Sequence, residues 1–555
     1  MNTYIEKIAS IIPKNDRKAL TVLFSTLFSL LTILGKKITF AGNICGDFNA
    51  NFIEKFVYSD IMLFVGWGVL FYIGLSCIVL IFRENNKIHN LFTNKTLFFK
   101  NKIIFGSIIF CLILLCWLPY ILTLYPCCLL PDTLSSINQA MGNASLNNHH
   151  PILFTFIVKF FLTIGSVLHL NTSDSMFLFS FSQTLFFAFT ITYFIIWLAK
   201  RGVNQYLCYL ILAYFLFSPV FVFYAMQIQK DTLFSLMCFH ITLILGDIVS
   251  MKENYFTDKL NVLKLILTLF LIIFLRNNGI YIVIIILAGI FIILPKFRKR
   301  ISLSFAIFMV GFLIVTGPVY KNNGLKGAAA ELYGIPLQQI GRTIVYKGNV
   351  STNDLEFINK ILPLEDFENC YKPCLVDPIK WSGNFNNEFL RDNQAKFLLI
   401  WAKNLPSNLT LYTEAFLMNT FGFWAFGEKN SYGYLDTYVF DNDYGIERIN
   451  LLEKWVGINM ENWISKYDYW GSGTLFWILL LSVYLLVYYK KYRKITMLMP
   501  CFAVWLSIMV ATPVAFSLRY VFVLALSLPL LLTLPCLSLN KNNIQKSFVS
   551  TNTIK

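Results

Sequence analysis

Five charged residues and two adjacent histidines stand at the ends of long apolar segments, which hold almost no ionisable side chains in their middle. They are Asp132, His149, His150, Lys230, Asp231, Arg276 and Arg519. A carboxylate can take a proton from a hydroxyl or hold a divalent metal against a phosphate. Lysine and arginine bind phosphate, and arginine does so with a bidentate fork. Together, these residue types suit the transfer of a group from a phosphate-linked donor to a hydroxyl.

Each of these residues also has a structural interpretation. Asp132 precedes residues 133–142 and is a common residue type for a helix N-cap. Lys230 and Asp231 would form an ion pair at the membrane interface, and the two arginines would extend to lipid headgroups. The histidines would be interfacial residues ahead of a helix that begins at Pro151. The sequence leaves both sets of interpretations open.

The composition is that of a polytopic membrane protein. Of 555 residues, 57% are hydrophobic and 14% are charged, against about 25% charged in a soluble protein. The net charge of +16 is therefore interpreted by side of the membrane, and not as a nucleic-acid-binding surface. The 12 cysteines show no zinc-ligand spacing. Cys370 and Cys374 lie in a polar segment, where a disulfide and two free thiols are equally consistent with the sequence.

Apolar runs predict twelve spanning helices, because a helix needs about 20 residues to cross about 30 Å. They lie at about 19–35, 60–82, 103–125, 174–198, 204–226, 232–250, 262–276, 279–295, 301–318, 472–489, 496–513 and 517–536. With this count, five basic clusters fall on one side together with both termini, as the excess of Lys and Arg in cytoplasmic loops requires. The clusters are 14–18, 83–102, 199–201, 296–300 and 490–494.

A thirteenth apolar run, 151–168, is expected not to cross the membrane. If it crossed, the clusters at 199–201 and 296–300 would face the opposite side from the first two. Its polar residues also form one helical stripe, at Thr155, Lys159, Thr163 and Ser166. We therefore expect an amphipathic helix at the outer interface.

The expected fold class is an all-α polytopic membrane protein of about 12 transmembrane helices, located in the cell membrane with both termini cytoplasmic. It has an outer loop of juxtamembrane helices and a mainly helical outer domain. The expected parts are two N-terminal helices and a cytoplasmic loop (1–102), a transmembrane core (103–318) that includes a catalytic outer loop (126–173), the outer domain (319–471), three C-terminal helices (472–538) and a disordered cytoplasmic tail (539–555).

The order of these parts resembles the GT-C superfamily of multipass membrane glycosyltransferases, which use polyprenyl-phosphate sugars. In that superfamily the first large outer loop opens with a catalytic acid and carries two juxtamembrane helices. PDTLSSINQAMG matches the acid and the first helix, and NNHHPILFTFIVKFFLTIGSVL matches the second. QKDTLFS matches the second acid at Asp231, and 319–471 matches the large outer domain that precedes the last helices.

Within that group the chain is similar to an uncharacterised bacterial family, over most of residues 100–530. The shared features are a Tyr-Pro…Asp opening, a His-His-Pro step, an Arg-x-Asn-Gly turn, IPLQQIGR (335–342), DPIK (377–380), FLMNTFGFW (416–424) and a late Arg-Tyr. The chain departs from the pattern where Cys-Cys follows Tyr-Pro, and its acid stands alone, without the paired acids of some relatives. The metal requirement is therefore left open.

The resemblance implies roles for ten residues. Asp132 would be the catalytic base, and Asp231 its partner or a metal ligand. Substrate-binding residues would be His149, His150, Lys230, Arg276 and Arg519, together with Gln338, Gln339 and Arg342 of the outer domain. The first two would position donor or acceptor, and the next three would bind the donor phosphate. The last three would contact the acceptor or, equally, be packing residues of that domain.

The implied activity is transfer of a hexosyl or related sugar from a polyprenyl-phosphate donor to a cell-envelope glycan, lipid or protein, at the outer face of the cytoplasmic membrane. No organic cofactor and no nucleic acid is implied, and a divalent cation, Mg or Mn, is left open. Two alternatives are a transporter or flippase of lipid-linked saccharide and a non-catalytic envelope-assembly protein. The lack of a detectable repeat and of mid-membrane ionisable residues argues against the transporter.

Overall fold

The structure, a computed structural model, describes residues 15–39, 52–84, 102–322, 324–325, 327, 329–429, 435–511 and 514–539. It is 75% helical. The named strands are β1 (Ile38–Thr39) and β2 (Phe52–Ile53), which pair antiparallel. The chain is therefore an all-α membrane protein, as its composition predicts. Most of the expected tail, 539–555, lies outside the described residues.

Six described helices are long and apolar enough to cross a membrane. They are α2 (Asn15–Lys37), α3 (Tyr58–Glu84), α5 (Lys102–Thr123), α8 (Thr172–Ala199), α11 (Lys230–Met251) and the continuous pair η8 (Tyr492–Leu498) and α26 (Met499–Val510). A seventh span results if α9 (Gln205–Phe217) and α10 (Val220–Met226), bent by 55°, count as one. The structure thus supports six or seven spans, and the twelve-span count stays a prediction.

Several expected spans are shorter helices of 17 residues or fewer, which reach about 26 Å at most. They are α12 (Lys259–Leu275), α13 (Gly279–Ile293), α14 (Arg298–Ile314), α25 (Ser472–Tyr488) and α27 (Phe522–Thr533). Short one-turn elements extend or join them: η2 (Lys252–Thr257), η3 (Pro295–Phe297), η4 (Val315–Val319), α15 (Tyr320–Asn322) and η9 (Arg519–Val521).

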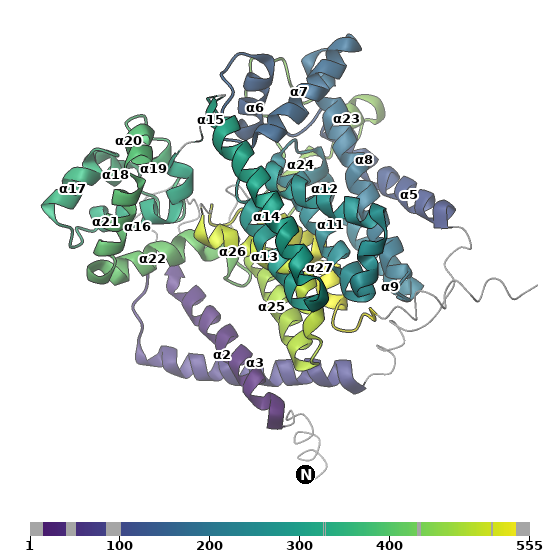
Figure 1. The fold of residues 1–555 in the computed structure, drawn as a ribbon, viewed down its shortest axis with the longest axis horizontal. Coiled ribbons are helices and arrows are strands. Elements are labelled where there is room, and N and C mark those ends of the chain that lie inside the picture. The colour runs from purple at the N-terminus through teal and green to yellow at the C-terminus, as the bar shows by residue number, and fades with distance from the viewer. Residues whose placement is uncertain are drawn as a thin grey trace, which may run out of the picture.

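One large apolar core joins the helices of the membrane region. Helix α11 lies at the centre of this core. Most of its side chains are buried, and it contacts α8, α12, α26 and α27. Figure 1 shows α11, α13, α25 and α27 together in the middle of the molecule. Helices α6 (Pro131–Met141) and α7 (Ile152–Val167) lie at one end of this bundle, at the top of the view.

The run predicted to lie at the interface, 151–168, forms α7. At 16 residues it is shorter than a span requires. It packs against α6 and α8, with Phe154 and Val158 buried. The chain turns back within a few residues to start α8, so α7 and α8 form a helical hairpin.

A second apolar core lies between Ala329 and Ile400, within the expected outer domain. We call residues 329–420 the outer part, after that prediction. Figure 1 shows its helices as a group beside the bundle. The elements of this part are η5 (Ala329–Tyr333), α16 (Gly334–Val345), α17 (Thr352–Asn359), α18 (Leu364–Cys370), α19 (Asp377–Lys380), α20 (Asn387–Asp392), α21 (Gln394–Asn404), η6 (Pro406–Asn408) and α22 (Leu409–Thr420). Cys370 and Cys374 are not joined in a disulfide.

Beyond α22 the chain returns to the bundle. Residues such as Phe421, Trp424 and Tyr469 belong to the large membrane core and not to the outer one. The elements here are η7 (Phe421–Phe423), α23 (Leu451–Val456) and α24 (Glu461–Lys466). The expected outer domain, 319–471, therefore contains one part with its own core and one part that packs on the membrane helices.

Candidate functional site

Backbone pairing of three distant segments positions the candidate site. Cys128 pairs in parallel with Gln227, and its neighbour Leu129 pairs in parallel with Val439. The segment 127–129 thus lies between the other two, with backbone hydrogen bonds of 2.9–3.1 Å on both sides. Because parallel segments run in the same direction, the residues that follow the first two emerge at the same edge.

A helix begins directly after each of the first two segments. Helix α6 starts at Pro131 and α11 at Lys230, so Asp132 and Asp231 are each the second residue of a helix. A carboxylate is favoured there by the positive end of the helix dipole. The N-cap of α6 is Leu130, and α6 has no side-chain cap hydrogen bond. Asp132 is therefore not the N-cap that one interpretation of the sequence proposed.

Asp132 forms ion pairs with two cations from distant parts of the chain. Lys230 Nζ donates to its Oδ2 at 2.9 Å, and Arg519 Nη2 lies 3.7 Å from the same oxygen. The Asp132 side chain is 30% exposed, so the carboxylate is partly open to solvent. A carboxylate, an ammonium and a guanidinium therefore meet at one partly open position.

The histidine step lies against the same lysine. Lys230 Nζ is 3.0 Å from Nδ1 of His150, which is buried. The His149 ring lies 4.3 Å from the His150 ring and 4.9 Å from the exposed Trp381 ring of the outer part, centroid to centroid. His149 Nδ1 is buried without a hydrogen-bond partner among the described residues.

Asp231 lies deeper than Asp132. Its side chain is 2% exposed, and it forms an ion pair with Arg276 at 3.4 Å. Neither of its oxygens accepts a hydrogen bond within the described structure. Arg276 also donates to the Tyr520 carbonyl at 3.3 Å, and the adjacent Arg519 donates to the Tyr520 hydroxyl at 2.9 Å. We call Asp132, His149, His150, Lys230, Asp231, Arg276, Arg519 and Tyr520 the Asp132 cluster.

The charges set the protonation states at the open end of this cluster. Burial would raise the pKa of Asp132, but the Lys230 and Arg519 cations outweigh it and hold the pKa well below its usual range. Burial and the Lys230 cation lower the pKa of His150 to about 3. Asp132 is thus a carboxylate and His150 a neutral imidazole at neutral pH, so Lys230 donates to Nδ1.

The turn between α12 and α13 holds the histidine step in place. Asn277 Nδ2 donates to the carbonyls of Asn148 and His149, at 3.3 and 3.5 Å. The turn is tight, because a Cβ on Gly279 would come within 2.0 Å of the Ile272 carbonyl oxygen. The Arg-x-Asn-Gly sequence therefore supplies Arg276 to the cluster and a tether to the loop.

Comparison with known protein families finds a match over most of the chain. The family model described as "Family of unknown function (DUF6020)" matches residues 140–547. The chain belongs to DUF6020. The match covers both histidines and every cation of the Asp132 cluster, and it begins eight residues after Asp132. No curated protein and no solved structure matches the chain.

Among the described residues, no contact joins three of the predicted binding residues of this DUF6020 chain to the Asp132 cluster. Gln338, Gln339 and Arg342 lie on α16 and are buried. The two glutamine side chains donate to backbone carbonyls, and Arg342 donates to Glu414 Oε2 through Nε at 3.0 Å and Nη2 at 2.6 Å. These contacts favour the packing interpretation over contact with an acceptor.

Sequence reasoning missed Asp436, whose electrostatic neighbours include Asp132 and Arg519. Burial raises the pKa of Asp436, the Asp132 charge raises it further, and Arg519 opposes both. Its position follows from the pairing of Val439 with Leu129. The only local signal is an acid within the largely aromatic sequence YLDTYVF. The sequence does not show that this segment pairs with the distant segment before Asp132.

The donor set does not suit a divalent cation. No group of three His, Cys, Asp or Glu side chains among the described residues could hold a metal. Both carboxylates of the cluster already face cations, Lys230 and Arg519 for Asp132 and Arg276 for Asp231. We therefore assign no step to a metal.

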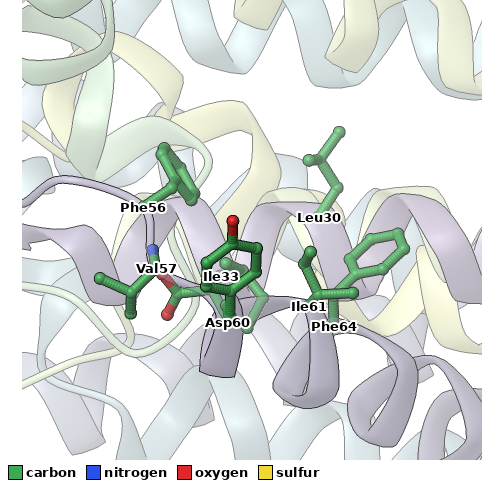
Figure 2. Close-up of a pocket in the computed structure, with 8 residues that line it drawn as sticks. Leu30, Ile33, Phe56, Val57, Asp60, Ile61 and Phe64 are labelled. Atoms are coloured by element: carbon green, nitrogen blue, oxygen red, sulfur yellow. The ribbon is translucent and has the colours of Figure 1, made fainter.

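A cavity of about 580 Å³ lies between α2 and α3, with none of its lining residues in the Asp132 cluster (Figure 2). Its lining is mostly apolar and consists of Leu30, Ile33, Phe56, Val57, Tyr58, Asp60, Ile61 and Phe64. Asp60 is ion-paired with Lys37 at 2.9 Å. Both helices precede the DUF6020 match, so we assign this cavity no part in the chemistry.

Proposed function

We propose that this chain is an integral-membrane glycosyltransferase, similar in its chemistry to the GT-C superfamily. It moves a sugar from a polyprenyl-phosphate donor to a hydroxyl of a cell-envelope acceptor at the outer face of the cytoplasmic membrane. The observation that carries the proposal is the partly exposed carboxylate of Asp132 between Lys230 and Arg519.

The arrangement provides the two charges that the reaction needs. The carboxylate of Asp132 accepts the proton of the attacking hydroxyl. Lys230 and Arg519 neutralise the phosphate as it leaves. Both functions meet at one oxygen of Asp132, which is 2.9 Å from one cation and 3.7 Å from the other.

The transfer exchanges one bond at the anomeric carbon of the sugar for another. The acceptor oxygen bonds to the anomeric carbon while the bond between that carbon and the phosphate oxygen breaks. The electron pair leaves with the polyprenyl phosphate, and the hydroxyl proton passes to Asp132. When the donor phosphate engages Lys230 and Arg519, their hold on Asp132 weakens and its pKa rises. Donor binding thus makes Asp132 a stronger base for the acceptor that follows.

The other members of the cluster position these groups. Neutral His150 accepts from Lys230 and directs the ammonium toward Asp132. Buried Asp231 holds Arg276, which in turn contacts the Tyr520 carbonyl beside Arg519. Because Asp231 is 2% exposed, it suits a positioning role better than contact with an acceptor.

The experiment compares envelope glycans and lipids in a deletion strain that carries the wild-type chain, Asp132→Asn or Asp441→Asn. Asp441 is an exposed acid and serves as the matched control. We expect wild type and Asp441→Asn to restore the missing sugar. Asp132→Asn should reach the membrane at normal abundance and lose about 10²–10⁴-fold in transfer, the range that general base catalysis contributes. Full restoration by Asp132→Asn, or a deletion strain with unchanged glycans and lipids, would overturn the proposal.

A further inference from the structure

The segment 451–470 carries three of the chain's 11 tryptophans, and all three side chains are exposed. Trp455 is 64% exposed, Trp463 47% and Trp470 49%. Val456 and Ile458 between them are exposed as well. Large apolar side chains gathered on one segment mark a surface that something covers.

This segment is firmly attached to the membrane core. Leu452, Ile464 and Tyr469 are buried, and the Tyr469 hydroxyl is hydrogen-bonded to that of Tyr214. The exposed rings therefore do not belong to a loose loop. Trp455 stands on α23 and Trp463 on α24, two short helices whose inner sides are fixed, and Trp470 follows the buried Tyr469.

The surroundings of the segment point to lipid. Helix α23 contacts α5, and the Trp463 ring lies 5.7 Å from the Tyr120 ring near the C-terminal end of α5. Helix α5 is a candidate span whose Leu115 and Leu118 are exposed, as lipid-facing residues are. Trp463, and Trp455 on α23, thus continue the exposed apolar surface of α5 at its C-terminal end, and Trp470 is exposed on the same segment.

We propose that residues 451–470 are an interfacial anchor, with Trp455, Trp463 and Trp470 inserted at the headgroup level of the outer leaflet. Indole rings favour this level because one edge is polar and the body is apolar. The proposal does not depend on the glycosyltransferase assignment. A carbohydrate surface or a contact with a second copy would not explain why the rings continue the exposed face of a spanning helix.

The anchor is connected to the Asp132 loop through the backbone. Ile449 N donates to the Tyr125 carbonyl at 2.9 Å, directly before the segment begins. Arg448 donates to the Thr437 carbonyl and lies 3.5 Å from the Cys128 sulfur. The depth of the tryptophans in the leaflet therefore sets the depth of Asp132.

The test measures tryptophan emission of the full chain in phosphatidylcholine vesicles. Wild type is compared with the triple variant Trp455→Phe/Trp463→Phe/Trp470→Phe, and the difference spectrum reports the three rings. The quenchers are aqueous iodide, lipid brominated near the headgroup and lipid brominated near the chain end. Trp117→Phe, at a fully buried position, is the control and should give a difference spectrum that no quencher changes.

We expect the headgroup-side bromine to quench the difference emission at least twofold more than either other quencher. Quenching mainly by iodide would place the rings in water, as for a glycan-binding surface, and would overturn the proposal. Insensitivity to all three quenchers would mean that protein covers them and would also overturn it. If the triple variant does not fold, Trp455→Phe alone, at the most exposed ring, gives the same comparison.

Discussion

Cys128 pairs in parallel with Gln227, and four residues beyond each of them the chain reaches an aspartate at the start of a helix. Asp132 and Asp231 are thus in equivalent positions, but their environments differ. Asp132 is 30% exposed beside Lys230, and Asp231 is 2% exposed beside Arg276. The Asp132 carboxylate is partly open to solvent, and the buried Asp231 carboxylate holds the Arg276 side chain in place.

Removal of the lysine should change how activity depends on pH. Lys230 is the larger of the two cationic influences that hold the pKa of Asp132 well below its usual range. Lys230→Gln should therefore raise that pKa, so that the acidic limb of the rate profile moves to higher pH. The measurement is kcat/KM for the donor from acidic to neutral pH, because this quantity reports the pKa of the enzyme before the donor binds. An unchanged acidic limb would contradict the assignment of Asp132 as the base.

His150 should act through its lone pair and not through a change in charge. Its pKa of about 3 keeps the imidazole neutral between about pH 5 and 8. His150→Asn places an amide oxygen near the position of Nδ1 and should keep most activity. His150→Leu removes the acceptor from Lys230 and should lower the rate at least tenfold. Equal rates for the two variants would show that the hydrogen bond is unimportant.

The buried ion pair makes a prediction about stability. Asp231→Asn leaves the Arg276 charge without its partner and should cost about 3–5 kcal/mol, the usual range for a broken buried pair. The double variant Asp231→Asn/Arg276→Gln should recover part of this loss. Thermal unfolding of the purified chain in detergent measures both. Strictly additive losses would show that the two side chains do not interact.

A substitution at Arg342 tests whether this side chain packs the outer part or binds an acceptor. Arg342 is buried and donates two partly buried hydrogen bonds to Glu414, so Arg342→Met should lower the unfolding temperature. The rate per folded molecule and the KM for acceptor should stay at the wild-type values. Lys360→Met, at an exposed position, should change none of these quantities. A raised KM without a loss of stability would restore the acceptor-binding interpretation.

The positions of two basic clusters test the topology. Lys200→Cys and Lys299→Cys are exposed sites that the charge pattern places inside the cell. A membrane-impermeant maleimide should label them, above the background of the parent chain, only after the cells are permeabilised. Labelling of either site in intact cells would contradict this topology, and labelling of both is the result expected if the run 151–168 crosses the membrane.

The sequence alone predicts the membrane class and the kinds of residue in the site. A composition of 57% hydrophobic residues indicates that the chain lies in a membrane. Ionisable residues are rare within apolar segments, so the few that border those segments on the expected outer side can be identified one at a time. What no local pattern contains is which of them meet: Asp132 and Lys230 are 98 residues apart, and their contact depends on the pairing at Cys128 and Gln227.

Helix lengths were less predictable for a related reason. Hydropathy marks 279–295 as a span, but the helix there ends at Ile293 after 15 residues. Asp436 was missed because its importance depends on the neighbouring pair Val439 and Leu129, which lie 310 positions apart. Gln338 and Arg342 carry polar side chains typical of binding sites, but packing within the outer core uses them.

The loop before Asp132 is held on both sides by segments made much later, at Gln227 and Val439. Synthesis proceeds from the N-terminus, so Asp132 leaves the ribosome long before either support exists. A nascent chain that ends before Val439 can insert its early helices, but it lacks the segment that pairs with Leu129 beside the candidate site. Under the proposed function, a truncated chain that ends before Val439 is therefore expected to insert in the membrane without transfer activity.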